Sequence, residues 1–125
     1  MSPHDEWMVK AEHNLLSAKK LFETGLYDTA IFHTQQCAEK ALKGYLAFKN
    51  LSIQKTHDIV LLKNLCAETD ASFSELLDAV VFLNTRDIQF RYPSEEMDPT
   101  HEEITQAIVF AENIFLFIKA LIQKK

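Results

Sequence analysis

Glycine, proline, cysteine and arginine are all scarce in this chain. Of its 125 residues, two are glycine and three are proline. This scarcity argues against a turn-rich β fold and favours a few long helices joined by short loops. The two cysteines, Cys37 and Cys66, lack CxxC spacing, so a disulfide framework is not expected. With no signal-peptide pattern and no apolar run near the roughly 18 residues of a membrane span, the sequence predicts a cytoplasmic protein without membrane association.

Acidic residues outnumber basic ones, and the net charge is −5. A protein that binds nucleic acid over its whole surface is usually basic, so any phosphate recognition must come from a local patch. There is no P-loop, GxGxxG or GxSxG motif. His33 and Cys37 are four residues apart, but no further cluster completes a tetrahedral set, so neither a metal nor a cofactor is expected. Hydrophobic residues make up 47% of the chain, enough for one core, and we expect a single domain over residues 1–125.

Apolar residues recur at three- and four-residue steps in five stretches, and this periodicity predicts helices. The expected helices cover about residues 3–23, 27–49 and 57–68, then from 72 or 73 to 86 or slightly beyond, and 101–125. Because most of the connections are short, the sequence predicts an all-α, up-and-down bundle of four to five helices.

Local signals place the helix ends. Ser2, Thr56 and Thr100 are the expected N-caps, and Glu103 would complete a capping box with Thr100. Gly25 is expected to end the first helix in a left-handed conformation.

Gly44 lies inside the second helix, where glycine costs about 1 kcal/mol against alanine. Close approach of another helix is the expected compensation.

The only arginines, Arg86 and Arg91, lie in the segment TRDIQFRYP. Arginine presents a planar fork that binds phosphate or carboxylate through two bonds, which lysine cannot do. Tyr92 follows Arg91 and can stack on a base or donate from its hydroxyl group. The alternative is that both arginines pair with nearby acids. We expect Arg86 to be a helix-end residue in a salt bridge and Arg91 to be the stronger candidate for phosphate binding.

A second candidate is Lys55-Thr56-His57-Asp58, at the expected start of the third helix. The amide groups and positive dipole of a helix start can bind an anion, and Lys55 and His57 add donors. The alternative is an ordinary cap with an exposed lysine and a histidine bonded to a neighbour.

The polar side of the second helix is the third candidate. His33, Gln36, Lys40 and Lys43 share one stripe, and Gln35 with Glu39 forms an adjacent one. A salt bridge between Glu39 and Lys43 is expected at i, i+4 spacing. The stripe is either a solvated face or a groove or dimer seam lined by polar groups.

Taken together, these sequence features resemble the HEPN family of small helical domains. The resemblance rests on LFETGLYDTAIFHTQQCAEKALKGYL, KTHDIVLL, FLNTRDIQFRYP and AIVFAENIFLFI, in that order. It implies a bundle similar to the C-terminal domain of kanamycin nucleotidyltransferase. It also implies a homodimer and a nucleotidyltransferase partner, in pairs that look like toxin–antitoxin systems.

Many members of the family are metal-independent ribonucleases with an Arg-x4–6-His motif. This chain departs from that motif, since nine residues separate Arg91 from His101. The polar set that the resemblance implies for this chain is Glu39, Lys40, Lys55, His57, Asp58, Arg91 and Tyr92.

Three functions remain open from the sequence. The first is a component that binds nucleotide or RNA phosphate through Arg91, Lys55 and the start of the third helix. The second is a diverged ribonuclease in which Arg91 stabilises phosphate charge and His57 acts as general acid–base. The third is a structural module in which Arg91 is buried against Asp58 or Glu39.

Overall fold

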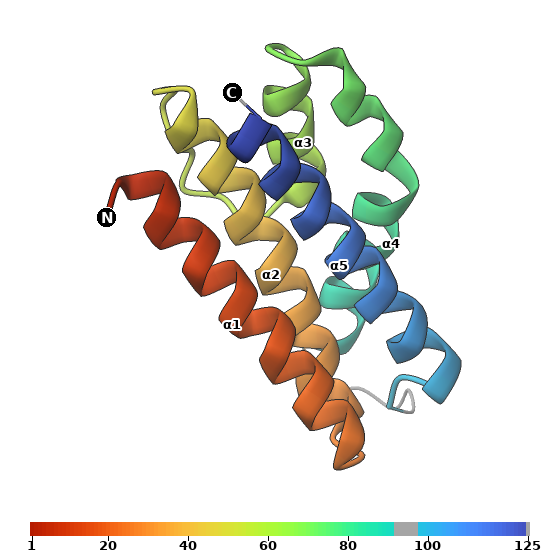
Figure 1. The fold of residues 1–125 in the computed structure, drawn as a ribbon. Coiled ribbons are helices and arrows are strands. Elements are labelled where there is room, and N and C mark those ends of the chain that lie inside the picture. The colour runs from red at the N-terminus through yellow and green to blue at the C-terminus, as the bar shows by residue number, and fades with distance from the viewer. Residues whose placement is uncertain (92–97, 125) are drawn as a thin grey trace.

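The chain folds into an all-α bundle, seen here in a computed structural model that describes residues 1–91 and 98–124, with the backbone alone described for residues 87–91. Its elements are α1 (Pro3–Glu23), α2 (Tyr27–Phe48), α3 (Ile59–Ala67), the 3-10 helix η1 (Ala71–Leu76), α4 (Leu77–Arg91) and α5 (His101–Lys124). In Figure 1, α1 runs down, α2 returns upward, α4 runs down and α5 runs up, with α3 added beside α2. The predicted fold class is therefore confirmed.

The predicted caps of α1 and α5 are present. Ser2 and Asp5 form a capping box at the start of α1. At the start of α5, the Thr100 hydroxyl accepts from the Glu103 amide at 3.0 Å, and the Glu103 carboxylate accepts from the Thr100 amide at 3.0 Å. Gly25 has φ +81° and lets the Leu26 amide donate back to the Leu21 carbonyl, which ends α1 as expected.

α1 and α2 form the most extensively packed pair of helices. They approach closely at Gly44, where a Cβ atom added to the glycine would lie 3.0 Å from Met8 Sδ and 3.2 Å from Trp7 Cβ. The prediction that Gly44 admits a neighbouring helix is confirmed.

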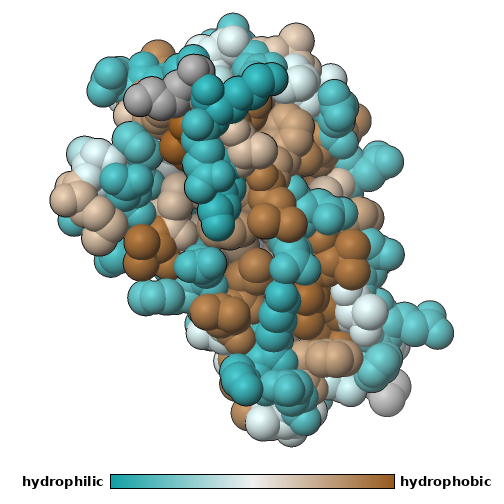
Figure 2. Space-filling model, viewed as in Figure 1, coloured by the Kyte–Doolittle hydropathy of each residue, from teal (hydrophilic) through white to brown (hydrophobic). Residues whose placement is uncertain are grey.

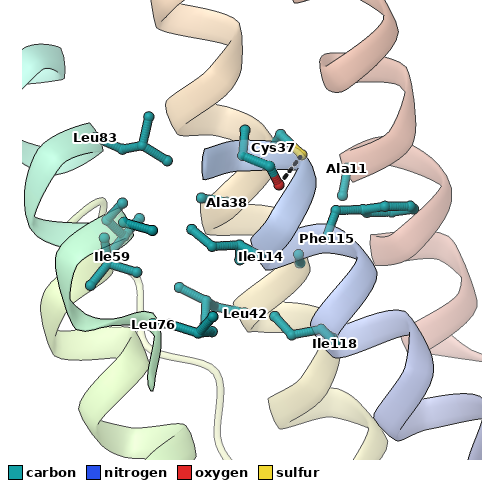
Figure 3. Packing of buried hydrophobic residues seen from close by; sticks show 14 of the residues in the cluster. Ala11, Cys37, Ala38, Leu42, Ile59, Leu76, Leu83, Ile114, Phe115 and Ile118 are labelled. Carbon is teal, nitrogen blue, oxygen red and sulfur yellow. Dashed lines mark hydrogen bonds between the residues drawn. The ribbon is translucent and has the colours of Figure 1, made fainter. Parts of the chain in front are cut away.

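The core lies between α2 and α5 and is closed by α1, α3 and α4. Figure 3 shows Ala38 and Leu42 of α2 near Ile114 and Ile118 of α5, with Leu83 of α4 on the opposite side. All five side chains are buried. This packing fixes the rotation of α2, so its remaining face is set toward α1 and toward the segment that precedes α3.

Two helix boundaries differ from the prediction. α3 begins at Ile59 instead of residue 57, because Asp58 and not Thr56 is its N-cap. α4 begins after η1 and extends to Arg91, so Arg86 lies inside the helix instead of at its end. A proline disfavours helical geometry in the residue just before it, so Pro93 is compatible with a helix whose last residue is Arg91.

Contrary to the expectation that no apolar run approaches a membrane span, α5 is long and apolar enough to cross a membrane by length and composition, with a mean hydropathy of 1.6 over its most apolar window. Residues of that helix, including Ile104, Ala107 and Ile114, are buried in the bundle. Figure 2 shows further hydrophobic side chains on the face formed by α1 and α5, interrupted by hydrophilic ones. The exposed large hydrophobic residues of these two helices are Val9, Leu16, Val109 and Leu116.

Candidate functional site

A buried carboxylate lies at the centre of the polar face of α2. Glu39 is only 4% exposed. One of its oxygens accepts from Lys43 Nζ at 2.9 Å, and the other is 2.9 Å from His57 Nδ1. The predicted i, i+4 pair with Lys43 is therefore present, but it is buried. A buried carboxylate is tolerated only when it is paired and hydrogen-bonded, and here two partners meet that requirement.

His57 reaches Glu39 from the segment between α2 and α3, which runs back along α2 (Figure 1). Its backbone carbonyl accepts from Gln35 Nε2 at 2.9 Å, and Gln36 Nε2 donates to the Gln35 side-chain oxygen at 2.9 Å. Both the backbone and the ring of His57 are thus held by α2. Its side chain is nevertheless 67% exposed.

The contact with Glu39 decides which nitrogen of His57 carries a proton. A carboxylate can only accept, so Nδ1 is the donor and Nε2 is the nitrogen left to contact a ligand. A ring held in this way can donate from Nε2 when it is protonated and accept there when it is neutral. Lys55, two residues earlier, is exposed on the same segment.

Asp58 has a different role from the predicted one. Its carboxylate accepts from the amides of Val60 and Leu61, at 3.0 and 3.2 Å, while its own amide donates to the Thr56 hydroxyl. The Asp58 side chain thus occupies two of the amides at the start of α3, as expected for the alternative of an ordinary cap. Asp58 also places a negative charge at the helix start, where it stabilises the dipole of α3.

A second polar network joins α2 to α1. Lys40 Nζ donates to Asn14 Oδ1 at 2.8 Å, and Asn14 Nδ2 lies 2.9 Å from His33 Nδ1. Since the oxygen of Asn14 accepts from Lys40, its nitrogen must donate to His33, which requires a bare Nδ1. Burial lowers the pKa of His33, and the charge of Lys40 lowers it further. Lys40 is thus bonded to α1 and not to Glu39.

The stripe on α2 is neither simply solvated nor uniform. Gln35, Glu39 and Lys43 are buried, whereas His33 and Lys40 are intermediate. The interpretation of a solvated face is therefore wrong for the buried three residues.

His33 and Cys37 do not converge on a common point. The Cys37 thiol points to the Ala111 carbonyl at 3.9 Å, whereas His33 bonds Asn14. Burial raises the pKa of Cys37 to about 12, which keeps the thiol protonated near neutral pH. Among the side chains of residues 1–86 and 98–124, no group of three or more His, Cys, Asp or Glu could hold a metal ion.

Of the two arginines, Arg86 is the one whose side chain is described. Its Nε is 3.6 Å from a Glu103 oxygen, and its guanidinium lies 3.9 Å from the centre of the Phe82 ring. The predicted salt-bridge role is confirmed. Arg91 is the last residue of α4, but its side chain and all of Tyr92 lie outside the described residues. Their predicted roles stay predictions.

The structure thus brings together Glu39 and His57 of the predicted set, and Lys55 is exposed two residues before His57 in the chain. The sequence reasoning missed Gln35 as the residue that holds the His57 backbone, and it missed Asn14 entirely. Asn14 did carry a signal, because it falls on the inward stripe of α1 with Ala11 and Ala18, where a polar residue requires a partner.

Comparison with known proteins gives matches along nearly the whole chain. The family model for the HEPN domain matches residues 4–121. The Methanocaldococcus jannaschii protein "Putative toxin MJ1304" is 28% identical over 130 residues, covering 93% of this chain and 86% of that protein.

Two solved structures are similar in fold. ST0689, described as an archaeal HEPN homologue, has a TM-score of 0.76 and 29% identity, covering 98% of this chain and 99% of its own. TT1696 from Thermus thermophilus has a TM-score of 0.78 and 26% identity, covering 95% of this chain and 98% of its own. The predicted family is thus confirmed, and the chain belongs to the HEPN domain family.

Proposed function

We propose that this protein binds nucleotide or RNA phosphate, as the toxin-like component of a pair with a nucleotidyltransferase. The observation that carries the proposal is the exposed imidazole of His57, held on buried Glu39. Lys55, two residues earlier in the chain, is also exposed. The similarity to a protein named as a toxin supports the toxin-like assignment.

The geometry suits an anion in the following way. Glu39 is paired with Lys43, so its charge is balanced inside the protein. The His57 and Lys55 side chains are both exposed, and both can donate to a phosphate oxygen when the histidine is protonated. Arg91 is the predicted third donor, and its planar fork would add two bonds to the same phosphate.

Titration of the purified chain with a short fluorescent RNA and with nucleoside triphosphates tests this proposal. We expect salt-sensitive binding, since each phosphate contact releases a counterion. Lys55→Ala and Arg91→Ala should each weaken binding. Each should also reduce the slope of the logarithm of the binding constant against the logarithm of salt concentration, by about the amount that one phosphate contact contributes. Lys20→Ala, which removes an exposed lysine on α1, is the matched control and should bind normally. Absence of binding to every nucleotide and RNA would contradict the proposal.

The same observation favours a second candidate, a metal-independent ribonuclease. A histidine whose Nδ1 is held by a carboxylate, with Nε2 directed outward, is arranged as a general acid–base. Cleavage of RNA in EDTA that is lost in His57→Ala would support this function. An RNase-free preparation that leaves RNA intact in the absence of its partner would eliminate it.

We also propose that the active unit is a homodimer. The apolar residues exposed on α1 and α5, such as Leu16 and Leu116, support this proposal because a second copy would remove them from water. Light scattering after gel filtration should give twice the chain mass, and Leu116→Glu should shift the protein to monomer. A monomeric natural chain at micromolar concentration would contradict the homodimer.

The nucleotidyltransferase partner has its own test. The proposal predicts a nucleotidyltransferase gene beside the gene for this chain, and co-expression of the two should yield a complex that elutes together. A chain that purifies alone from such co-expression would remove the partner from the proposal.

A further inference from the structure

A hollow of about 300 Å³ lies along the N-terminal half of α1. Pro3, Glu6, Trp7 and Lys10 line it, and their three- and four-residue spacing places them on one face of the helix. Trp7 is partly buried, because its Cβ packs on α2 at Gly44. Trp7 therefore lies at the junction of α1 and α2 and also lines the hollow.

A continuous row of contacts connects this hollow to His57. Lys43 Nζ lies 5.8 Å from the centre of the Trp7 ring. The same ammonium group donates to Glu39 at 2.9 Å, and Glu39 is 2.9 Å from His57 Nδ1. The aromatic ring and the exposed imidazole are therefore separated by one buried ion pair.

We propose that the hollow is a base-stacking subsite and that the ligand is a single-stranded nucleic acid. One base would stack on Trp7 while a neighbouring phosphate lies at His57 and Lys55. This inference rests on the proposed function and names the substrate class of that site.

Three physical arguments support a single strand. Proteins that bind single strands combine cationic groups along the backbone with aromatic rings on which the bases stack, and the row from Trp7 to Lys55 has both. A duplex keeps the faces of its bases covered by their neighbours, so it cannot present one to Trp7. Lys43 stabilises the indole through a cation–π contact, which reduces the ordering cost of binding.

The polar residues of the hollow fit the same ligand. Lys10 is exposed and can contact a further phosphate of the strand. Glu6 is also exposed, and its carboxylate can accept from the amino group of a base. A hollow that held only phosphate would have no use for the acid and the indole.

Trp7 is the only tryptophan of the chain, so its fluorescence reports directly on this subsite. The intact protein is titrated with a short oligoadenylate, with an abasic ribose-phosphate strand of equal length and with the matching RNA duplex. We expect the oligoadenylate to quench the emission and to bind tightest. The abasic strand should bind more weakly and leave the emission unchanged.

Variants of Trp7 separate stacking from packing. Trp7→Leu keeps an apolar side chain on α2 but should weaken oligoadenylate binding by roughly five- to a hundred-fold, the range for loss of one base–aromatic stack. Its affinity for the abasic strand should not change. Trp7→Phe retains a ring, so its affinity for the oligoadenylate should lie between that of the natural chain and that of Trp7→Leu. If Trp7→Leu does not fold, the fluorescence of the natural chain and the affinity of Trp7→Phe decide.

The titrations distinguish failure of the stacking subsite from failure of the proposed phosphate site. Equal affinity for the oligoadenylate and the abasic strand, with no change in emission, would overturn the stacking subsite and leave the phosphate site standing. Failure of all three strands to bind would overturn both proposals.

Discussion

Two histidines contact polar residues of the same bundle through their Nδ1 atoms, with opposite consequences. His57 faces the carboxylate of Glu39, whereas His33 faces the amide nitrogen of Asn14. The acid requires a proton on Nδ1 and the amide requires its absence. His57 can therefore gain a second proton on Nε2 without losing its partner, but His33 must break its bond with Asn14 to become charged. The difference marks His57 as the ring suited to bind or transfer protons.

The largest effect is expected from removing Glu39. Glu39→Ala leaves Lys43 buried without its partner, and breaking a buried ion pair costs about 3–5 kcal/mol. Urea unfolding measures the loss. The double variant Glu39→Leu with Lys43→Met removes both charges and should recover most of the stability. A loss below about 1 kcal/mol for Glu39→Ala would show that the pair is hydrated like a surface bridge.

Removing the Asn14 side chain should lower the free energy of unfolding by less than removing Glu39 does. Asn14→Ala leaves Lys40 and His33 without their shared partner, but both of those side chains retain access to water. We expect a loss of about 1–3 kcal/mol, the cost of an unsatisfied polar group, toward the lower end. Urea unfolding of Asn14→Ala and Glu39→Ala under the same conditions compares the two losses directly. A larger loss than for Glu39→Ala would reverse the comparison.

Lowering the pH should act through His33. Its pKa is lowered below 6.5, first by burial and then by Lys40. The unfolded chain therefore binds a proton at His33 more readily than the folded chain does. The contribution of neutral His33 to the free energy of unfolding is complete above about pH 6.5 and is lost as the pH falls below it. Unfolding midpoints from about pH 8 to 5 should fall in the natural chain and fall less in His33→Gln. His13→Gln, at an exposed position of α1, should keep the natural slope.

The smallest effect is expected for Lys40→Ala on ligand binding. Lys40 belongs to the Asn14 network, so its loss should weaken RNA affinity less than Lys55→Ala does. Fluorescence anisotropy with the same labelled RNA measures both variants. A stronger effect of Lys40→Ala would move the phosphate site toward α1.

Much of the fold follows from local sequence signals. The Thr100–Glu103 capping box, the Gly25 stop and the close approach at Gly44 each depend on residues near one another in the chain or on one steric rule. The start of α3 was harder to predict because Thr56 and Asp58 are both good caps two residues apart. The choice between them depends on where the backbone of His57 is held by Gln35.

The candidate site was predictable in its members but not in its contacts. The spacing of Glu39 and Lys43 predicts their pairing, yet periodicity cannot show that the pair is buried. That burial depends on the return of residues 49–58 along α2, which brings His57 to Glu39 across 18 positions in sequence. The partner of Lys40 lies 26 positions away on α1, and no local pattern specifies it.

The most direct test of the central claim compares the two histidines. RNA affinity is measured in EDTA by fluorescence anisotropy for the natural chain, His57→Ala and His33→Ala, with circular dichroism confirming that each variant is folded. We expect His57→Ala to lose roughly tenfold or more in affinity, as removal of a charge-assisted phosphate contact would cause, while His33→Ala binds as the natural chain does. Equal affinities of the two variants, or a greater loss for His33→Ala, would contradict the assignment of His57 as the functional ring.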